Sequence, residues 1–371
     1  MTNSTDQNFP FITYDSSQSY FEWGVEHGKA FSLAIKELSS IRRELMLQKN
    51  PALKNQINSL ALKQFQISKD YAPHIAEELE GIAKGSGVSL EDIIILNNYT
   101  DFRDIELPDE GCSTVHIQND DVITAGQTWD MHSSAKNHLA LISVPAKEGR
   151  PASLVFTLVG CVGMMGYNED NNLIAVNNIN TKNAKAGLIW PVFVRKLLEE
   201  RNFENIKSNL LLSPVTSGHN YMISTVNGAS HFEVTPDIDQ ELFHLKKDEP
   251  GYNFHTNHCL GKNVIPYEDS ISSNSTTHNR FELLDKKLTQ TKTPSDLVSL
   301  LTDHDGYPKS ICSHFESGAQ DPSMTCGGAV ADLTNKTIYF WRGCPEHDNN
   351  FKDYTFSLNQ TKSNKMFTLK S

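Results

Sequence analysis

The chain has 371 residues, 38% of them hydrophobic, and a formal net charge of −12 at pH 7. This length and composition allow one large buried core, and the acidic residues are spread along the chain, so no positive field for nucleic acid is present. We therefore expect a single domain over 1–371 and no nucleic-acid partner.

The sequence predicts neither a secretory signal nor a membrane span. Residues Met1 to Gln7 lack the basic and apolar segments of a secretory signal. No stretch of about 18 consecutive apolar residues occurs, as a transmembrane helix would require. We expect a cytoplasmic protein with no membrane span.

Apolar spacing predicts a mostly helical first part of the chain. Positions three and four apart recur from Tyr20 to Leu45, which is typical of an amphipathic helix, and Gly24 and Gly28 are expected to lie close to another backbone. A second helical region is predicted from Leu53 to Ala83, interrupted near Pro73.

Short strand-like runs begin after Cys112, separated by turn-forming residues. Two helices interrupt them, at 191–200 and at 294–301, where Thr293 is the expected cap. Alternation of strands with helices favours an α+β layered fold. The predicted strands are 115–117, 122–125, 139–144, 154–159, 173–176, 328–333 and 336–342.

Cys112 lies in the stretch Gly111-Cys112-Ser113-Thr114. A cysteine attacks as the thiolate, and its free pKa of about 8.5 means that a base or an electropositive setting is needed at neutral pH. A histidine is one possible base. The other is the α-amine of the cysteine itself, with a pKa of about 7.7–8.0. That amine exists only after cleavage of the Gly111–Cys112 bond, and a glycine tolerates the strained backbone that such cleavage needs.

Several motifs in order resemble the penicillin acyltransferase family of N-terminal-nucleophile (Ntn) hydrolases, and more distantly the bile salt hydrolases and acid ceramidases. They are Gly24-Val25-Glu26-His27-Gly28, the segment 78–85 with Leu96-Asn97, Gly111-Cys112-Ser113-Thr114, Gln127-Thr128-Trp129-Asp130, Asn177-Asn178-Ile179, Thr256-Asn257-His258, Ser310-Ile311-Cys312-Ser313-His314 and Gly343-Cys344-Pro345.

The resemblance implies a four-layer αββα sandwich of two antiparallel sheets, made as an inactive precursor. The precursor would cut itself between Gly111 and Cys112. A mostly helical N-terminal fragment, 1–111, would then stay associated with a catalytic fragment, 112–371, in which Cys112 is the nucleophile and its amine the base.

The resemblance also implies roles for further residues. Asp130, 18 residues after Cys112 on the next strand of an expected hairpin, would hydrogen-bond near the nucleophile and favour its ammonium form; a turn aspartate is the alternative. Asn257 matches an oxyanion asparagine. Asn177, or its neighbour Asn178, resembles a second asparagine on the substrate side. Arg280 resembles an arginine that supports the site, with a solvated helix-face arginine as the alternative.

Cysteine and histidine patterns favour no metal site. The six cysteines form no C-x-x-C pair, which argues against a zinc ribbon or a disulfide framework. Histidines 116, 255, 258, 304 and 314 allow a Cys/His pair or a metal site, but no acidic second-shell pattern accompanies them. Cys312 and Cys326 are expected to pack as small hydrophobes. The six cysteines are Cys112, Cys161, Cys259, Cys312, Cys326 and Cys344.

Three functions follow from these residues. The first is an amidohydrolase that cleaves a linear N-acyl amide through a thioester on Cys112. The second is an N-acyltransferase that uses a coenzyme A thioester as co-substrate; neither needs a bound cofactor. The third is an uncut, non-catalytic binding protein. The small-molecule partner is thus an acyl amide or acyl thioester, and the sequence specifies no oligomeric state.

Overall fold

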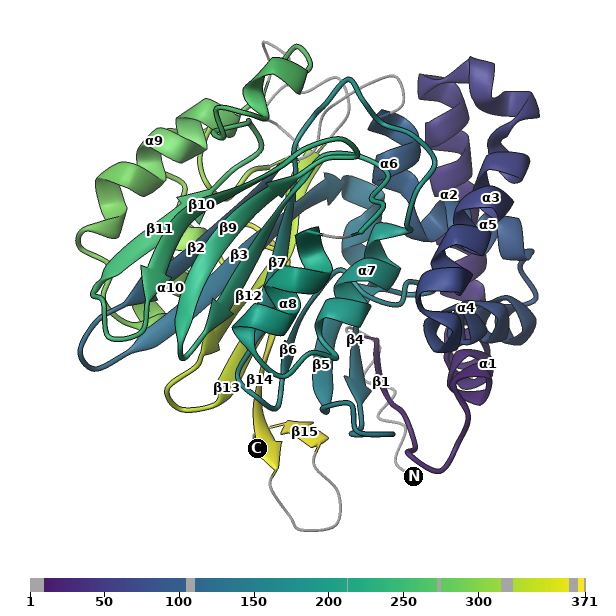
Figure 1. The fold of residues 1–371 in the computed structure, drawn as a ribbon, viewed down its shortest axis with the longest axis horizontal. Helices are drawn as coiled ribbons and strands as arrows, with labels where there is room; N and C mark the ends of the chain where they lie inside the picture. The colour runs from purple at the N-terminus through teal and green to yellow at the C-terminus, as the bar shows by residue number, and fades with distance from the viewer. Residues whose placement is uncertain are drawn as a thin grey trace.

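The computed structural model describes residues 10–104, 111–211, 213–271, 275–314, 323–359 and 366–369. Two twisted sheets lie face to face at its centre (Figure 1). In spatial order the first sheet holds β1 (Phe11–Thr13), β4 (Leu139–Val144), β5 (Ser153–Leu158), β6 (Met165–Asn168), β7 (Leu173–Asn178), β8 (His219–Thr225), β9 (Gly228–Val234) and β10 (Asp239–Lys246). The second holds β11 (Gly251–His255), β2 (Cys112–Gln118), β3 (Ile123–His132), β12 (Ser323–Asp332), β13 (Thr337–Arg342), β14 (Lys352–Asn359) and β15 (Met366–Leu369).

Helices cover the outer faces of both sheets. α7 (Trp190–Leu197) and α8 (Phe203–Leu211) pack on the first sheet, and α9 (Thr277–Leu288) and α10 (Pro294–Leu301) pack on the second. The order of layers is helix, sheet, sheet, helix, which confirms the predicted α+β fold of the αββα type. The N-terminal helices gather at one side of Figure 1; they are α1 (Tyr20–Ala30), α2 (Ser32–Lys49), α3 (Ile57–Tyr71), α4 (Pro73–Ser86), α5 (Leu90–Asn97) and α6 (Tyr99–Asp104).

One pairing departs from the predicted antiparallel sheets. β1 runs parallel to β4, with Ile12 opposite Ile142, whereas the other paired strands are antiparallel. A parallel pair needs a long crossover connection, and the N-terminal helices provide it. The first strand of the chain therefore belongs to a sheet built mainly from residues that follow Cys112.

The expected helix over Tyr20 to Leu45 is two helices, because the chain turns at Phe31 between α1 and α2. The turn lets α1 lie directly on α4. A Cβ atom on Gly24 would lie 2.0 Å from the carbonyl oxygen of Glu78, and one on Gly81 would lie 2.2 Å from that of Phe21. The predicted close approach at Gly24 is confirmed, and so is the interruption at Pro73, which starts α4.

Buried polar contacts join the N-terminal helices to the rest of the core. Glu78 of α4 pairs with Arg195 of α7 at 3.2 Å, and both side chains are buried. The hydroxyl of Tyr14 donates to the same carboxylate at 2.7 Å. Since each charge has a partner and further hydrogen bonds, the pair tolerates burial.

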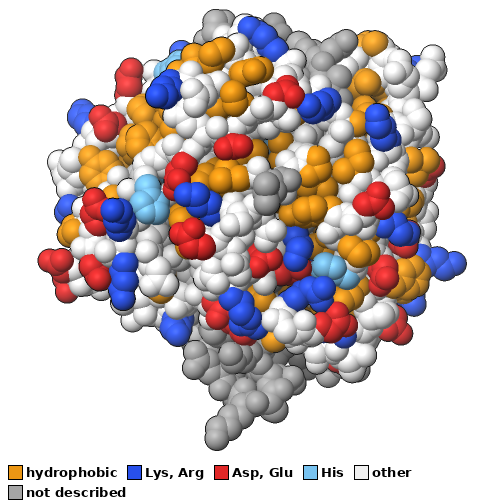
Figure 2. Space-filling model, viewed as in Figure 1, with side chains coloured by type: hydrophobic (Ala, Val, Ile, Leu, Met, Phe, Trp, Pro, Cys, Tyr) orange, Lys and Arg blue, Asp and Glu red, His pale blue; other side chains and the backbone are white. Residues whose placement is uncertain are grey.

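Side chains of both charges are mixed on the face shown in Figure 2. Within the part of the chain that the structure describes, no helix is both long and apolar enough to cross a bilayer.

Candidate active site

The β2–β3 hairpin brings Cys112 and Asp130 together. Cys112 is the first residue of β2 and lies opposite Trp129 of β3. Asp130 therefore lies beside Gly111, and its backbone N–H donates to the Gly111 carbonyl oxygen at 2.8 Å. The expectation that the two ends of this hairpin meet is confirmed.

Asn257 binds the backbone of the cysteine. It follows the end of β11, which pairs with β2 so that His255 lies opposite Thr114. Its Oδ1 accepts from the backbone N–H of Cys112 at 2.8 Å. Its Nδ2 donates to the carbonyl oxygen of Asn178 at 2.9 Å, which fixes the orientation of the amide.

Arg280 comes from α9 and is 1% exposed, so it is not a solvated helix-face residue. Its guanidinium donates to the Cys112 carbonyl oxygen at 2.6 Å, to Ser113 Oγ at 3.0 Å and to Asn257 Oδ1 at 2.7 Å. Burial lowers the pKa of Arg280, while nearby Asp130 and Cys112 oppose that fall. The guanidinium thus brings a buried positive charge to the cysteine.

Asn177 reaches the same cysteine from β7 of the opposite sheet. Its Nδ2 donates to the carbonyl oxygens of Cys112 at 3.1 Å and His255 at 3.4 Å. Its Oδ1 accepts from Thr114 and from Asn220, each at 2.7 Å. In this uncut chain both N–H groups point to backbone carbonyls, so Asn177 clamps β2 and β11 to the first sheet.

The bond between Gly111 and Cys112 is held on both sides. The carbonyl of Gly111 accepts from Asp130, and the N–H of Cys112 donates to Asn257. A Cβ atom on Gly111 would lie 2.4 Å from Asp130 Oδ2 and 3.2 Å from Arg280 Nη2. Only glycine fits at this position without displacing the two charged groups.

The sequence does not predict one neighbour of Asp130. Thr325 of β12 lies opposite Asp130, and its hydroxyl donates to Asp130 Oδ1 at 2.7 Å. It lies 195 residues along the chain from Asp130, and no local motif marks it.

Two of the histidines considered as bases have other partners: His255 bonds Glu233 at 2.9 Å and His116 bonds Ser224 at 2.7 Å.

The chain is similar in sequence to known proteins. Residues 117–345 match the model of the family described as acyl-coenzyme A:6-aminopenicillanic acid acyl-transferase. The chain is 27% identical over 355 residues to the acyl-coenzyme A:6-aminopenicillanic-acid-acyltransferase 40 kDa form of Emericella nidulans, covering 92% of this chain and 95% of the relative.

Two solved structures are also similar. Penicillin V acylase from Agrobacterium tumefaciens is 13% identical, with a TM-score of 0.36 over 67% of this chain and 92% of that one. A variant of conjugated bile acid hydrolase from Clostridium perfringens is 12% identical, with a TM-score of 0.40 over 68% of this chain and 98% of that one.

The family match starts after Cys112 and covers more than half of the chain, including strands of both sheets, α7 to α10 and the residues Asp130, Asn177, Asn257 and Arg280. This chain belongs to the acyl-coenzyme A:6-aminopenicillanic acid acyl-transferase family.

Proposed function

We propose that this chain is a self-processing cysteine amidohydrolase whose nucleophile is Cys112. The observation that carries the proposal is the Gly111–Cys112 bond. Its carbonyl accepts from the Asp130 N–H and its N–H donates to Asn257, with the Arg280 guanidinium on the next carbonyl. These contacts hold a peptide bond next to its own thiol, with a donor aimed at the oxygen where charge develops.

Processing follows from simple acyl-transfer chemistry. The Cys112 thiol attacks the Gly111 carbonyl carbon as its proton moves toward the Cys112 nitrogen, and the Asp130 N–H stabilises the resulting oxyanion. The C–N bond then breaks, the thiol proton goes to the leaving amine, and Gly111 becomes a thioester on Cys112. Water hydrolyses the thioester to a carboxylate at Gly111 and a free thiol. The products are fragments 1–111 and 112–371.

The freed α-amine would then serve as the base for substrate. Asn257 already accepts from this nitrogen at 2.8 Å, so it holds the amine next to its own thiol. Asp130, held by Thr325, would stabilise the ammonium that forms when the amine takes the thiol proton. One N–H of Asn257 Nδ2 bonds Asn178, and we assign the second to the oxyanion of a linear acyl amide. The acyl group passes to Cys112 as a thioester, and water releases the acid.

Acyl transfer is the second candidate, and the relative from Emericella nidulans supports it. The covalent intermediate would be the same thioester on Cys112. The acyl donor would be a coenzyme A thioester and the acceptor an amine in place of water. No resident cofactor is needed in either case.

Intact mass of the purified wild-type chain tests the processing step. Scaling 41.6 kDa by 111 and 260 of 371 residues predicts co-eluting pieces of about 12 and about 29 kDa. Cys112→Ala should give one full-length mass, and Cys161→Ala, which removes a buried thiol outside the site, should be cut like the wild type. An uncut wild type with an unreactive Cys112 would overturn the proposal in favour of a non-catalytic binding protein.

Product analysis separates the two enzymatic candidates. The processed protein would be given a linear N-acyl amide or an acyl-coenzyme A, each with and without an amine acceptor. Release of free acid from the amide without acceptor supports hydrolysis. N-acylated product formed only from acyl-coenzyme A with an amine would replace hydrolysis by acyl transfer.

A further inference from the structure

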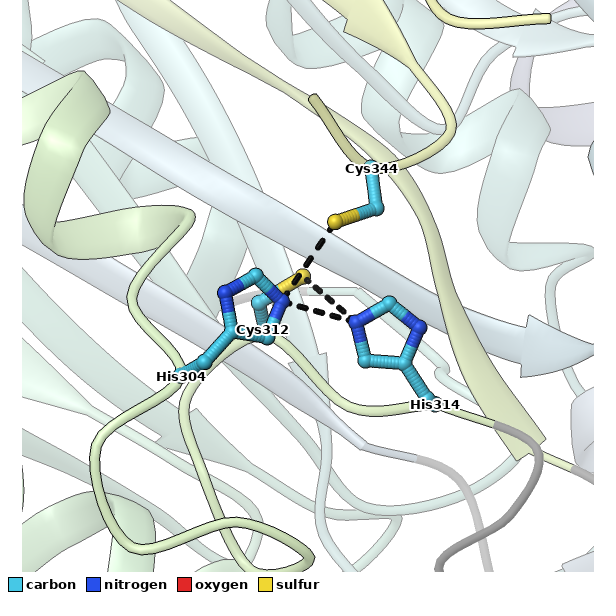
Figure 3. A group of neighbouring side chains, drawn as sticks. All are labelled: His304, Cys312, His314 and Cys344. Carbon is cyan, nitrogen blue, oxygen red and sulfur yellow. Dashed lines mark hydrogen bonds between the residues drawn. The ribbon is translucent and has the colours of Figure 1, made fainter. Parts of the chain in front are cut away.

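Four metal-ligating side chains converge about one point beside the active site. His304 follows α10, Cys312 and His314 lie in the same loop further on, and Cys344 follows β13. Their ligand atoms all lie within 4.8 Å of one another (Figure 3). The sequence predicts no metal here, because the cysteines form no C-x-x-C pair and no acidic second-shell pattern accompanies the histidines.

The distances suit a tetrahedral ion. The Nε2 atoms of His304 and His314 are 2.7 Å apart, Cys344 Sγ is 3.4 Å from His304 Nε2, and Cys312 Sγ is 3.9 Å from His314 Nε2. Zinc binds sulfur at about 2.3 Å and imidazole nitrogen at about 2.0–2.1 Å, so its tetrahedral ligands lie roughly 3.3–3.8 Å from one another. Small side-chain movements would bring the four atoms to these separations.

The donor set also selects the kind of metal. Two thiols and two imidazoles suit a borderline-soft ion such as zinc, and calcium or magnesium would require oxygen ligands. Cys312 and Cys344 are each 1% exposed, so the sulfurs are shielded from water. Loss of the two thiol protons on binding would leave two thiolates and two neutral imidazoles around a divalent ion, a centre with no net charge.

A carboxylate lies behind one of the four side chains. Glu346 Oε2 lies 3.3 Å from His304 Nδ1, the ring nitrogen that points away from the other three ligands. A carboxylate behind a ligating histidine is common in the second layer of a metal site.

We propose that His304, Cys312, His314 and Cys344 bind a structural zinc ion. All four tetrahedral positions are filled by protein, so the ion has no open position for substrate. It fastens the loop after α10 to the loop after β13.

The loop that carries Cys312 and His314 is connected to Asp130 by hydrogen bonds. Ser313, between two of the ligands, accepts from the N–H of Thr325 at 2.9 Å and donates its own N–H to the Thr325 hydroxyl at 2.8 Å. That hydroxyl donates to Asp130 at 2.7 Å. The zinc ion therefore holds Asp130 in position through Thr325 of β12.

Metal content tests the proposal independently of processing. Full-length wild type, Cys112→Ala, Cys161→Ala and Cys344→Ala would be equilibrated with zinc, separated from free ion and analysed for metal. About one zinc per chain is expected in the first three, including the uncut Cys112→Ala, and at least a tenfold loss in Cys344→Ala. Wild type without zinc, or equal zinc in Cys344→Ala, would overturn the site.

A cobalt titration of the wild-type chain tests the site even if Cys344→Ala does not fold. Metal-free wild type titrated with Co²⁺ should develop a thiolate charge-transfer band and an intense tetrahedral spectrum that saturate at one equivalent. A weak octahedral spectrum with no thiolate band would refute zinc binding. So would a non-reduced peptide mass showing a disulfide between Cys312 and Cys344, because it would consume both sulfur ligands.

Discussion

Arg280 joins three parts of the active site through one buried side chain. Its bonds to Cys112, Ser113 and Asn257 diverge from the planar guanidinium, and a lysine at this position has no such fork. A hydrogen bond to a charged group is worth about 1.5–3 kcal/mol. Each lost bond would therefore slow a reaction that depends on it by roughly tenfold or more.

Arg280→Lys should thus process itself roughly 10- to 100-fold more slowly than wild type while remaining folded. The measurement is the rate at which the full-length mass disappears after synthesis. Arg201→Lys is the matched control, because Arg201 bonds Glu169 and Asp170 at the surface. Equal processing rates for Arg280→Lys and wild type would show that processing does not depend on the hydrogen bonds of the Arg280 guanidinium.

Thr325 offers a second change of a single residue. Thr325→Val keeps the shape of the side chain but removes the hydroxyl that donates to Asp130 and accepts from Ser313. Slower processing is expected, since Asp130 loses a hydrogen bond that holds it beside Gly111. Zinc content should stay at the wild-type level, since none of the four ligands changes. A variant that processes at the wild-type rate would show that the Thr325 hydroxyl is not needed to hold Asp130 in place.

Local sequence predicted the active site better than the proposed zinc site. Cys112 and Asp130 lie on adjacent strands of one hairpin, so their meeting follows from short-range pairing. Asn257 and Arg280 were identified only by resemblance, and their contacts with Cys112 depend on how β11 and α9 pack. The zinc ligands converge from separate loops, and their spacing in the sequence gives no indication of that.

At the scale of elements, apolar runs located helices and the completely buried strands β4, β5 and β7, but missed strands that carry several polar residues. β8 and β9 are completely buried, yet they carry polar residues such as His219, Asn220 and Glu233. Several of their polar side chains bond neighbouring strands or the second sheet: Asn220 donates to Asn177 of β7, and Glu233 bonds His255 of β11. Alternation of polar and apolar residues is therefore lost there, and strand prediction from one sequence fails.

The α1–α4 contact gives a prediction for a pair of elements. Gly81→Ala would place a Cβ atom 2.2 Å from the carbonyl oxygen of Phe21, so the two helices must separate. The free energy of unfolding should fall by about 1–3 kcal/mol, the usual cost of an overpacked core position. Urea titration of the uncut Cys112→Ala chain measures it. Lys84→Ala, exposed on the same helix, should change it by less than about 0.5 kcal/mol.

For the whole molecule, buried neutral histidines limit stability in acid. Burial lowers the pKa of His27 and of His116 to about 3. In the unfolded chain both have their ordinary pKa, 6.5. Below that value the unfolded state binds protons that the folded state does not, so stability is lost as the pH falls from about 6.5 toward about 3.

Urea midpoints of the Cys112→Ala chain in chelator-containing buffer, measured from pH 7.5 down to pH 4, should therefore decrease. Each of the two histidines contributes up to about 1.4 kcal/mol per pH unit. His116→Gln should reduce the slope by one such increment, because Gln does not titrate. A flat profile between pH 6 and pH 4 would contradict the burial of neutral imidazoles.

The place of β1 has a consequence for how the protein can be made. Two contacts join the part of the chain before Gly111 to the part after it. One is the pairing of β1 with β4, and the other is the ion pair between Glu78 and Arg195. As one chain the molecule folds in a first-order process. If the chain is cut as proposed, its two pieces must find each other in solution, so recovery from urea would become second order and fall on dilution. The uncut Cys112→Ala chain should refold equally at every concentration. The proposed processed form would therefore be assembled once, during its own synthesis, and would not be readily reassembled afterwards.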